Sequence, residues 1–146
     1  MRYLIYKNNK VFSLLLIIFL IIGCTQKNTV SIDQLKGYWE IDFVKQQGEV
    51  FKTNSVTPLY DHYIFREKKG VLNKVAPSMM GIFQTSKNAT SFQVEKRKEN
   101  YYLNFKTSLD NWSKKIILLN HQKLILEHGG KKFFYKRPQL INLNNE

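Results

Sequence analysis

Cysteine is almost absent from this chain, since Cys24 is the only one among 146 residues. A single cysteine cannot form an intramolecular disulfide, so the folded part must be held together by its core alone. Proline is also scarce, with three residues, and no window of helical length beyond the N-terminal region carries an apolar stripe with a 3.6-residue period. These shortages exclude a disulfide scaffold and a helical bundle.

Long apolar runs are missing as well. The one uncharged apolar run covers 11–22, which is shorter than the ~20 residues that a transmembrane helix needs. Arg2, Lys7 and Lys10 precede this run without any acidic residue, and this is the layout of a signal peptide. We therefore predict export rather than a permanent transmembrane anchor.

A short motif surrounds the single cysteine. Residues 21–24, Ile-Ile-Gly-Cys, resemble a lipobox, in which the cysteine receives acyl chains such as palmitate and becomes the first residue of the mature protein. Two such chains anchor a protein stably to a membrane. We predict a lipoprotein signal peptide over 1–23 and a lipidated tether over 24–30. Thr25, in place of aspartate, favours the outer membrane of a Gram-negative cell envelope, and the alternative for Cys24 is a plain buried thiol.

Acidic residues are few compared with basic ones, 11 against 23, which gives a formal net charge of +12. A basic surface attracts an anionic membrane face, acidic glycans or an acidic protein partner. The alternative is that these side chains simply keep the surface solvated. Because nucleic acid is scarce outside the cell, we expect no nucleic acid partner. The basic residues near the C-terminus are Lys114, Lys115, Lys131, Lys132, Lys136 and Arg137.

The chain is rich in short stretches that alternate apolar and polar residues. In the first stretch Trp39, Ile41 and Phe43 fall on one face, and Glu40 and Asp42 fall on the other. This alternation is typical of a half-buried strand. Further stretches of this kind cover 60–67, 71–75, 81–85, 91–96, 101–106, 112–119, 124–126 and 133–135.

Turn signals separate these stretches. Gly129-Gly130 predicts a tight hairpin, because both residues can adopt the positive φ that such a turn requires. Other turns are predicted at Lys69-Gly70, Lys87-Asn88 and Asn120-His121. Before the first strand, Ser31 and Gln34 have the spacing of a capping box, and Gly37 ends the single helical turn that fits there.

The pattern as a whole predicts one all-β domain over 31–138, followed by a polar tail over 139–146. Its spacing favours a small antiparallel up-and-down β-barrel of about 8–10 strands with a short N-terminal helical turn, and a β-sandwich is the alternative. Closure into a barrel would remove the exposed edges of the sheet.

The two ends of this domain resemble the lipocalins and the smaller lipocalin-like lipoproteins of Gram-negative bacteria. Gly37-Tyr38-Trp39 is similar to the Gly-x-Trp signature that opens the first strand of that family, and residues 133–137, Phe-Phe-Tyr-Lys-Arg, are similar to its last strand. The resemblance implies a barrel in which a basic residue near the end of the last strand lies over the signature tryptophan. Arg137 shares parity with Phe133 and Tyr135, so it could stack on Trp39 as a cation–π pair.

No convergent set of residues indicates catalysis, a cofactor or a metal. His121 and His128 flank one short strand with odd spacing, which would place them on opposite faces, and His62 lies far away in the sequence. Glu40 and Asp42 share the outer face of the first strand, where a carboxylate pair could act as acid and base but where solvated carboxylates are more common. We therefore expect a protein that is not an enzyme.

Large aromatic side chains dominate the predicted inward-facing positions beside Trp39. In a barrel of about eight strands the interior is either filled by side chains or holds one small ligand. Both alternatives remain open at this point. The residues that would line such a pocket are Phe43, Phe65, Phe92, Tyr101, Phe105, Phe133 and Tyr135.

The sequence thus leads to two functional hypotheses. The first is a non-catalytic, lipocalin-like envelope lipoprotein, anchored through Cys24, that binds a small apolar ligand. The second is a protein-interaction module, such as an immunity or inhibitor lipoprotein, whose basic surface binds an acidic protein partner.

Overall fold

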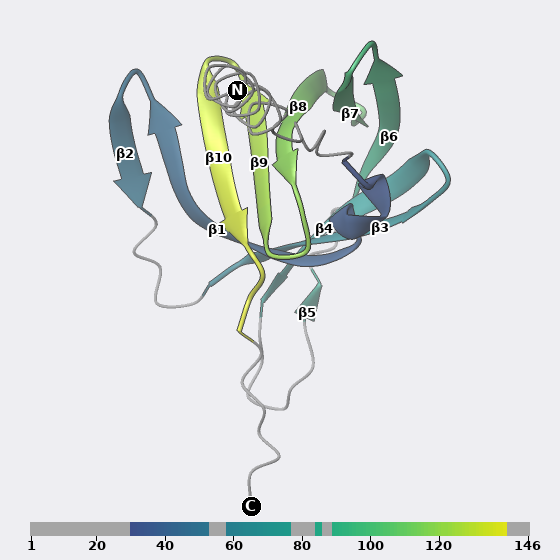
Figure 1. Cartoon of the computed structure of the whole chain (residues 1–146). Coiled ribbons are helices and arrows are strands. Elements are labelled where there is room, and N and C mark those ends of the chain that lie inside the picture. The colour runs from purple at the N-terminus through teal and green to yellow at the C-terminus, as the bar shows by residue number, and fades with distance from the viewer. Residues whose placement is uncertain (1–29, 53–57, 77–83, 86–88, 140–146) are drawn as a thin grey trace, which may run out of the picture.

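The structure is a computed structural model, and it describes residues 30–52, 58–76, 84–85 and 89–139. Ten strands and one 3-10 turn make up this part of the chain (Figure 1). The elements are η1 (Ile32–Leu35), β1 (Gly37–Gln46), β2 (Glu49–Lys52), β3 (Tyr60–Arg66), β4 (Lys69–Ala76), β5 (Gln84–Thr85), β6 (Thr90–Arg97), β7 (Asn100–Lys106), β8 (Asn111–Leu119), β9 (Lys123–His128) and β10 (Lys131–Lys136).

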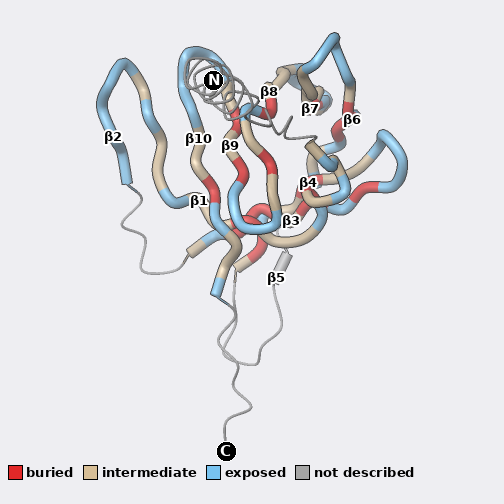
Figure 2. The backbone as a smooth tube through the Cα atoms, viewed as in Figure 1, coloured by how far each residue is buried: buried red, intermediate tan, exposed pale blue. Residues whose placement is uncertain are grey.

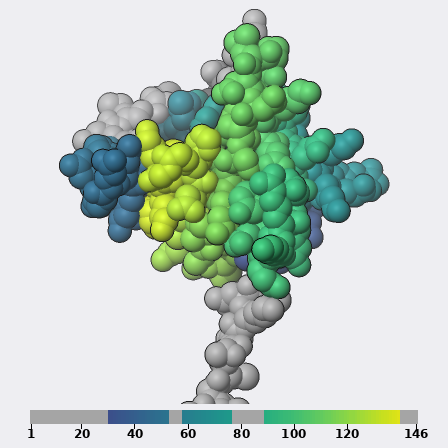
Figure 3. Space-filling model, turned by 90° about the horizontal axis from the view of Figure 1, so that it is seen from above, coloured from purple at the N-terminus to yellow at the C-terminus, as the bar shows by residue number. Residues whose placement is uncertain are grey.

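The strands form one antiparallel sheet that closes on itself. Its order is β10-β9-β8-β7-β6-β4-β3-β1, and the pairing of β10 with β1 completes a barrel of eight strands. Seen from above, the blue N-terminal strands lie directly beside the yellow strand β10 (Figure 3). β2 pairs with the second half of β1, and the short β5 pairs with β4. The prediction of an all-β antiparallel barrel with a short helical turn is confirmed.

The barrel strands turn alternate side chains into a common interior. Buried positions lie in the middle of the strands, whereas the turns between them are exposed (Figure 2). The core includes a row of aromatic rings across neighbouring strands, with Phe92 edge-on to Tyr63 and tilted against Phe105, which stacks on Trp112. Leu103 packs in the same core and, like these rings, lies on a strand along which inward-facing and outward-facing residues alternate, as the two-residue period of a strand predicts.

One end of the barrel is plugged by η1. Leu35 and Trp39 are both 0% exposed, and the indole Nε1 of Trp39 donates a hydrogen bond to the carbonyl oxygen of Leu35 at 2.8 Å. The predicted capping box is wrong, because Ser31 occupies the cap position without a side-chain capping bond in the described structure. The backbone carbonyl of Ser31 instead accepts a hydrogen bond from the Gln34 N–H at 3.1 Å. We call this end of the barrel the closed end.

One turn differs from its predicted position. The turn between β3 and β4 lies at Glu67-Lys68, and Glu67 adopts a positive φ of 56°. Gly70, predicted to be in this turn, lies inside β4 opposite Phe65, where a side chain would collide with its neighbours. The hairpin at Gly129-Gly130 has the predicted positive φ values of 54° and 72°. Residues 81–83 and the predicted turn at Lys87-Asn88 lie outside the described residues.

A β-bulge in β1 overturns the predicted face of Phe43. The pairing with β10 shifts register between Ile41 and Phe43, so the extra residue Asp42 reverses the alternation. Phe43 therefore stacks on Phe134 with ring centroids 4.3 Å apart, on the face opposite to the buried Tyr135. Phe43 lines the outside of the barrel rather than its interior. Strand β2, which the sequence patterns did not indicate, pairs with β1 just beyond this bulge.

Candidate functional site

The predicted signature residues meet at the closed end. The guanidinium of Arg137 lies 3.7 Å from the ring centroid of Trp39, which is the stacking that strand parity predicted. The same group donates hydrogen bonds to four carbonyl oxygens, at 3.2, 3.1, 3.0 and 2.6 Å, those of His121, Lys36, Tyr38 and Gln34. Gly37, with a φ of +99°, leaves room for it, since a Cβ there would lie 3.2 Å from Arg137 Nη1. This arrangement seals the closed end and leaves no space for a ligand there.

The opposite end of the barrel, which we call the open end, carries the β1–β2, β7–β8 and β9–β10 turns. On the side formed by β1 and β10 its inward-facing residues are less buried than the core. Val44 and Phe133, which pair across these two strands, are half-buried, and Phe51, opposite Val44 on β2, is 50% exposed.

A carboxylate lies inside the barrel. Asp61 on β3 alternates with the core residues Tyr63 and Phe65, so its side chain points inward, and the residue is only 2% exposed. Its Oδ1 forms an ion pair with Nζ of Lys74, which stands directly opposite on β4. Tyr135 lies near the same carboxylate. Burial, followed by the nearby Asp61, raises the pKa of Tyr135 well above its usual value. The carboxylate thus has its partners within the fold.

A second lysine also points inward. Lys114 on β8 pairs with the fully buried Leu103 and has the parity of Ile116, a core residue. Its Nζ lies 5.5 Å and 5.0 Å from the ring centroids of Phe105 and Phe133. No hydrogen bond or ion pair to this Nζ occurs within the described part of the chain. Burial lowers the pKa of Lys114; the negative charge of Asp61 opposes this shift and the like charge of Lys74 adds to it.

A hydroxyl group completes the interior set. Tyr63 is only 1% exposed, and its buried hydroxyl has no hydrogen-bond partner among the described residues. Burial, with contributions from Tyr135 and Asp61, raises the pKa of Tyr63 well above its usual value, so the group remains a neutral donor. We call Asp61, Lys114, Tyr63 and Tyr135 the interior polar cluster; Lys74, which pairs with Asp61, has a side chain that is 54% exposed.

The sequence patterns missed the charged members of this cluster. Lys114 was grouped with Lys115 as part of a solvated basic surface, and Asp61 and Lys74 were not singled out. The signal that could have found Asp61 and Lys114 is parity, because each alternates along its strand with residues that pack in the core. A lysine between Trp112 and Ile116 is the clearest example.

Six of the predicted lining residues contribute to the interior or its packing. Phe65, Phe92, Phe105 and Tyr135 are buried in the core, whereas Tyr101 and Phe133 are partly buried against it. These side chains belong to one packed core, so the filled interior considered from the sequence describes much of the barrel. Phe43 is the exception, because the bulge turns it outward.

The polar residues weighed for catalysis have structural partners. On the outer face, Lys136 Nζ is 3.7 Å from Glu40 Oε1 and 3.5 Å from Asp42 Oδ1, so this cation lies between the two carboxylates and offsets part of their charge. His128 Nδ1 lies 2.8 Å from the Ser113 carbonyl oxygen, and His62 stacks on the ring of Tyr38. Within the described ranges no group of three His, Cys, Asp or Glu residues could hold a metal ion.

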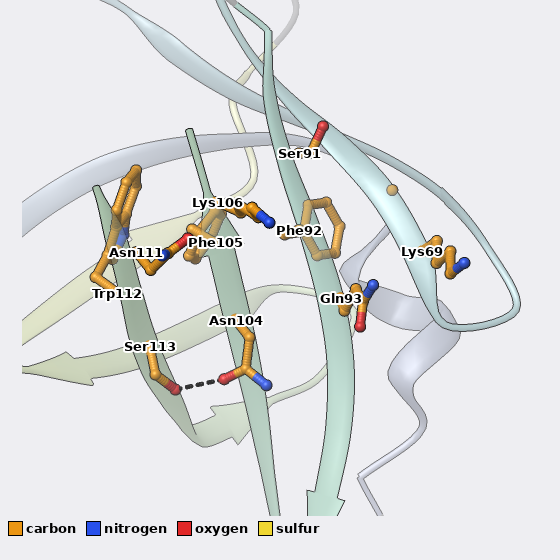
Figure 4. A pocket seen from close by; sticks show the side chains of 11 residues that line it. Lys69, Ser91, Phe92, Gln93, Asn104, Phe105, Lys106, Asn111, Trp112 and Ser113 are labelled. Atoms are coloured by element: carbon orange, nitrogen blue, oxygen red, sulfur yellow. Dashed lines mark hydrogen bonds between the residues drawn. The ribbon is translucent and has the colours of Figure 1, made fainter. Parts of the chain in front are cut away.

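A groove of about 610 Å³ is lined by residues of β4, β6, β7 and β8, among them Phe92, Phe105 and Trp112 (Figure 4). Asn104 also lines it, on the face opposite to the buried Phe105. Its amide is held by its neighbours, since Ser113 Oγ donates to Asn104 Oδ1 at 2.8 Å and Asn104 Nδ2 donates to Glu95 Oε2 at 2.7 Å. This groove therefore offers aromatic rings as well as hydroxyls and amides.

Comparison with known proteins found similar solved structures but no matching family model or curated sequence. A protein from Bacteroides eggerthii matches with a TM-score of 0.45 and 12% identity, covering 70% of this chain and 98% of its own. A lipocalin-like protein from Bacteroides uniformis matches with a TM-score of 0.46 and 13% identity, over 72% of this chain and 99% of its own. The chain is thus similar in structure to a bacterial lipocalin-like protein.

Proposed function

We propose that this protein is a non-catalytic binding protein whose barrel takes up a small ligand with an apolar body through the open end. The observation that carries the proposal is the contrast between the two ends. The closed end is sealed by Trp39 and Arg137, whereas at the open end Val44 and Phe133 remain partly exposed. Partly exposed apolar side chains at the mouth of a barrel suit an apolar molecule of modest size.

An uncharged fluorescent probe, N-phenyl-1-naphthylamine, tests this binding. We expect saturable fluorescence enhancement with one site per chain. Val44→Trp would fill the open end from inside, and we expect it to weaken binding at least about tenfold, which corresponds to the loss of one well-packed ring contact. Lys45→Trp is the matched control, because the next residue faces outward and its Nζ lies over Phe134. Equal effects of the two variants, or no enhancement with the wild type, would contradict the proposal.

We further propose that the protein is exported and held in the cell envelope by acyl chains on Cys24. The support is the motif at residues 21–24 and the basic, then apolar, segment before it. Among the described residues there is no helix with the length and apolar character needed to cross a bilayer. Metabolic labelling with an alkyne analogue of palmitate should mark the wild type and leave Cys24→Ser unmarked. Membrane fractionation should place the wild type with outer-membrane markers.

A second function, binding of an acidic protein, is favoured by one specific surface. Phe43 and Phe134 stack on the outer face of β1 and β10, with Lys45 Nζ 5.8 and 5.6 Å from their ring centroids, and Val50 beside them is 50% exposed. Native mass spectrometry of complexes from envelope extracts tests this function. A stoichiometric complex that Lys45→Glu abolishes would support it, and retention of that complex by the variant would count against this surface.

A further inference from the structure

We propose that the groove across β4, β6, β7 and β8 binds a short stretch of an acidic oligosaccharide whose sugar units carry carboxylates. The groove has a volume of about 610 Å³. It is separate from the open end of the barrel, so this inference goes beyond the proposed uptake of an apolar ligand and does not depend on it.

The groove lies on the outer face of the sheet. Phe92 and Phe105 are only 2% exposed and belong to the core, so their side chains point inward. The residues on both sides of each of them along the strand line the groove, and alternation turns these residues outward. Val94 and Leu103, the next inward-facing residues on β6 and β7, do not line it. A ligand in the groove therefore contacts the outside of the barrel.

Two parallel rows of polar side chains form the walls of the groove. Within each row the members pair directly across neighbouring strands, so they stand side by side (Figure 4). The first row consists of Lys69, Gln93, Asn104 and Ser113, and the second consists of Ser91, Lys106 and Asn111. Neighbouring strands are about 4.8 Å apart, so the first row extends over about 14 Å, and two residues along a strand separate the rows by about 7 Å. These dimensions suit a few pyranose rings in a line.

The two rows offer hydrogen bonds together with positive charge. Amides and hydroxyls both donate and accept hydrogen bonds, as the neighbouring hydroxyls of a sugar require. Lys69 and Lys106 stand one in each row, and neither forms an ion pair with another described residue. Among the described residues that line the groove there is no aspartate or glutamate. The groove is therefore complementary in charge to a ligand that carries carboxylates.

The groove is poorly suited to an ordinary protein interface. The centre of such an interface is rich in aromatic and apolar side chains that become buried on binding. In the groove Phe92 and Phe105 are already buried, and Trp112 is half-buried. The strongly exposed large apolar side chains lie elsewhere, and they are Val50, Phe51, Leu59, Ile64, Leu109 and Ile117. A ligand rich in hydroxyl groups is the better match.

Asn104, in the first row, is fixed before any ligand arrives. Its Oδ1 accepts a hydrogen bond from Ser113 Oγ at 2.8 Å, and its Nδ2 donates one to Glu95 Oε2 at 2.7 Å. Arg97 holds Glu95 in turn, since its Nε and Nη2 donate to the carboxylate at 2.8 and 2.7 Å. The amide therefore loses little conformational freedom on binding, and the described residues leave its second N–H as a donor.

Isothermal titration calorimetry with tetragalacturonate and with its methyl ester tests the inference. The two probes have the same sugar units, and only the acid is charged. We expect the wild type to bind the acid at one site per chain and at least about tenfold more tightly than the ester, because charge-assisted hydrogen bonds are the stronger kind. No measurable binding of the acid, or equal binding of acid and ester, would overturn the inference.

Substitutions of exposed residues locate the site. Lys106→Gln should weaken binding of the acid about tenfold and leave ester binding within about twofold. Gln93→Ala should weaken binding of both probes about threefold, because it removes a partner of the sugar hydroxyls. Lys115→Gln is the matched control, since Lys115 also faces outward on β8 but does not line the groove. Equal losses from Lys106→Gln and Lys115→Gln would mean that general surface charge attracts the acid, and the groove would be the wrong site.

The Val44→Trp variant separates this inference from the proposed function. Val44 does not line the groove, so we expect the variant to bind tetragalacturonate as the wild type does. Loss of tetragalacturonate binding in this variant would place the saccharide at the open end and overturn the inference. If the wild type binds tetragalacturonate but not N-phenyl-1-naphthylamine, the proposed function is wrong while the groove site stands.

Discussion

At the scale of single residues, Arg137 ties the last strand to the first helical turn across most of the sequence. Its guanidinium covers Trp39 and donates to four backbone carbonyl oxygens, among them those of Gln34 and Lys36 at the end of η1. Burial lowers the pKa of Arg137, but a guanidinium stays protonated at any physiological pH. The side chain therefore supplies donors to carbonyls that a short 3-10 turn leaves without partners.

The first prediction concerns this residue. Arg137→Met should lower the free energy of unfolding by about 2–4 kcal/mol, since four charge-assisted hydrogen bonds and a cation–π contact are lost together. Arg137→Lys should recover only part of this loss, because an ammonium cannot match the planar fork. Urea unfolding followed by tryptophan fluorescence measures both variants. A change below about 0.5 kcal/mol in the Met variant, the size of an ordinary surface substitution, would contradict this role.

A second residue-scale prediction concerns Glu95 on the outer face. Hydrogen bonds from Arg97, then from Asn104, lower the pKa of Glu95 to about 2. Because this value lies below that of an unfolded glutamate, the stabilising contribution of Glu95 is complete above pH ~4.5 and is lost as the pH falls toward 2. NMR titration of the Glu95 carboxyl carbon should give a midpoint near 2. In Arg97→Gln this midpoint should move up toward the ordinary glutamate value.

At the scale of secondary-structure elements, close packing between β3, β4 and β6 requires a glycine. A Cβ on Gly70 would collide with Phe65 Cβ and the Ile64 carbonyl oxygen, and would lie 2.8 Å from Phe92 Cζ. The backbone of β4 can approach these strands only because Gly70 has no side chain. The sequence suggested a turn at this glycine, whereas the structure shows a close contact inside a strand.

The third prediction follows from this contact. Gly70→Ala should destabilise the protein by about 3 kcal/mol, because strand backbone rather than a flexible side chain would have to move. Gly129→Ala is the control, since a Cβ there meets nothing within 4 Å and only the positive φ of 54° opposes it. We expect the control to cost about 1–2 kcal/mol. Thermal unfolding by circular dichroism compares the two, and equal losses would argue against the packing explanation.

The bulge in β1 decides which aromatic residues belong to the core, and this gives the fourth prediction. Phe92→Ala should cost about 3–5 kcal/mol because it leaves a cavity in the packed aromatic row. Phe43→Ala should cost only about 1 kcal/mol, since its ring stacks on Phe134 on the outer face. Chemical denaturation measures both values. A loss for Phe43→Ala as large as that for Phe92→Ala would mean that Phe43 is a core residue.

At the scale of the whole molecule, closure of the barrel depends on the last strand. β10 pairs with β1 on one side and β9 on the other, and it carries Phe133 and Tyr135 into the interior. Without β10, both neighbouring strands would expose unpaired edges and the core would open. Closure also brings the first and last strands together, which makes folding depend on contacts between distant parts of the sequence.

The fifth prediction tests this dependence with two truncations of the mature chain. A chain that stops after residue 130 lacks β10 and Arg137, and we expect it to lose cooperative unfolding and to aggregate. A chain that stops after residue 138 keeps the predicted domain 31–138, and its midpoint of thermal unfolding should stay within a few degrees of the full-length value. Cooperative unfolding of the shorter chain would show that the barrel does not need this closure.

A structural feature could be predicted from the sequence when its signal comes from residues that are neighbours in the chain. The strands and the Gly129-Gly130 hairpin were predictable, because alternation and positive φ are properties of neighbouring residues. The pairing of Arg137 with Trp39 was also within reach through parity and family resemblance. β2 was missed because its four exposed residues carry no buried face to produce a pattern.

The sequence by itself therefore determined the class of fold, the period of its strands and the residues that seal the closed end. Only the tertiary structure decided that Asp42 forms a bulge and that Phe43 turns outward, since a bulge arises from the register between two strands. It also decided that Asp61 and Lys114 share one interior, because the walls of a barrel face each other only after closure. The physical reason is that the local backbone sets the direction of each side chain, whereas the pairing of the strands decides which other side chains it contacts.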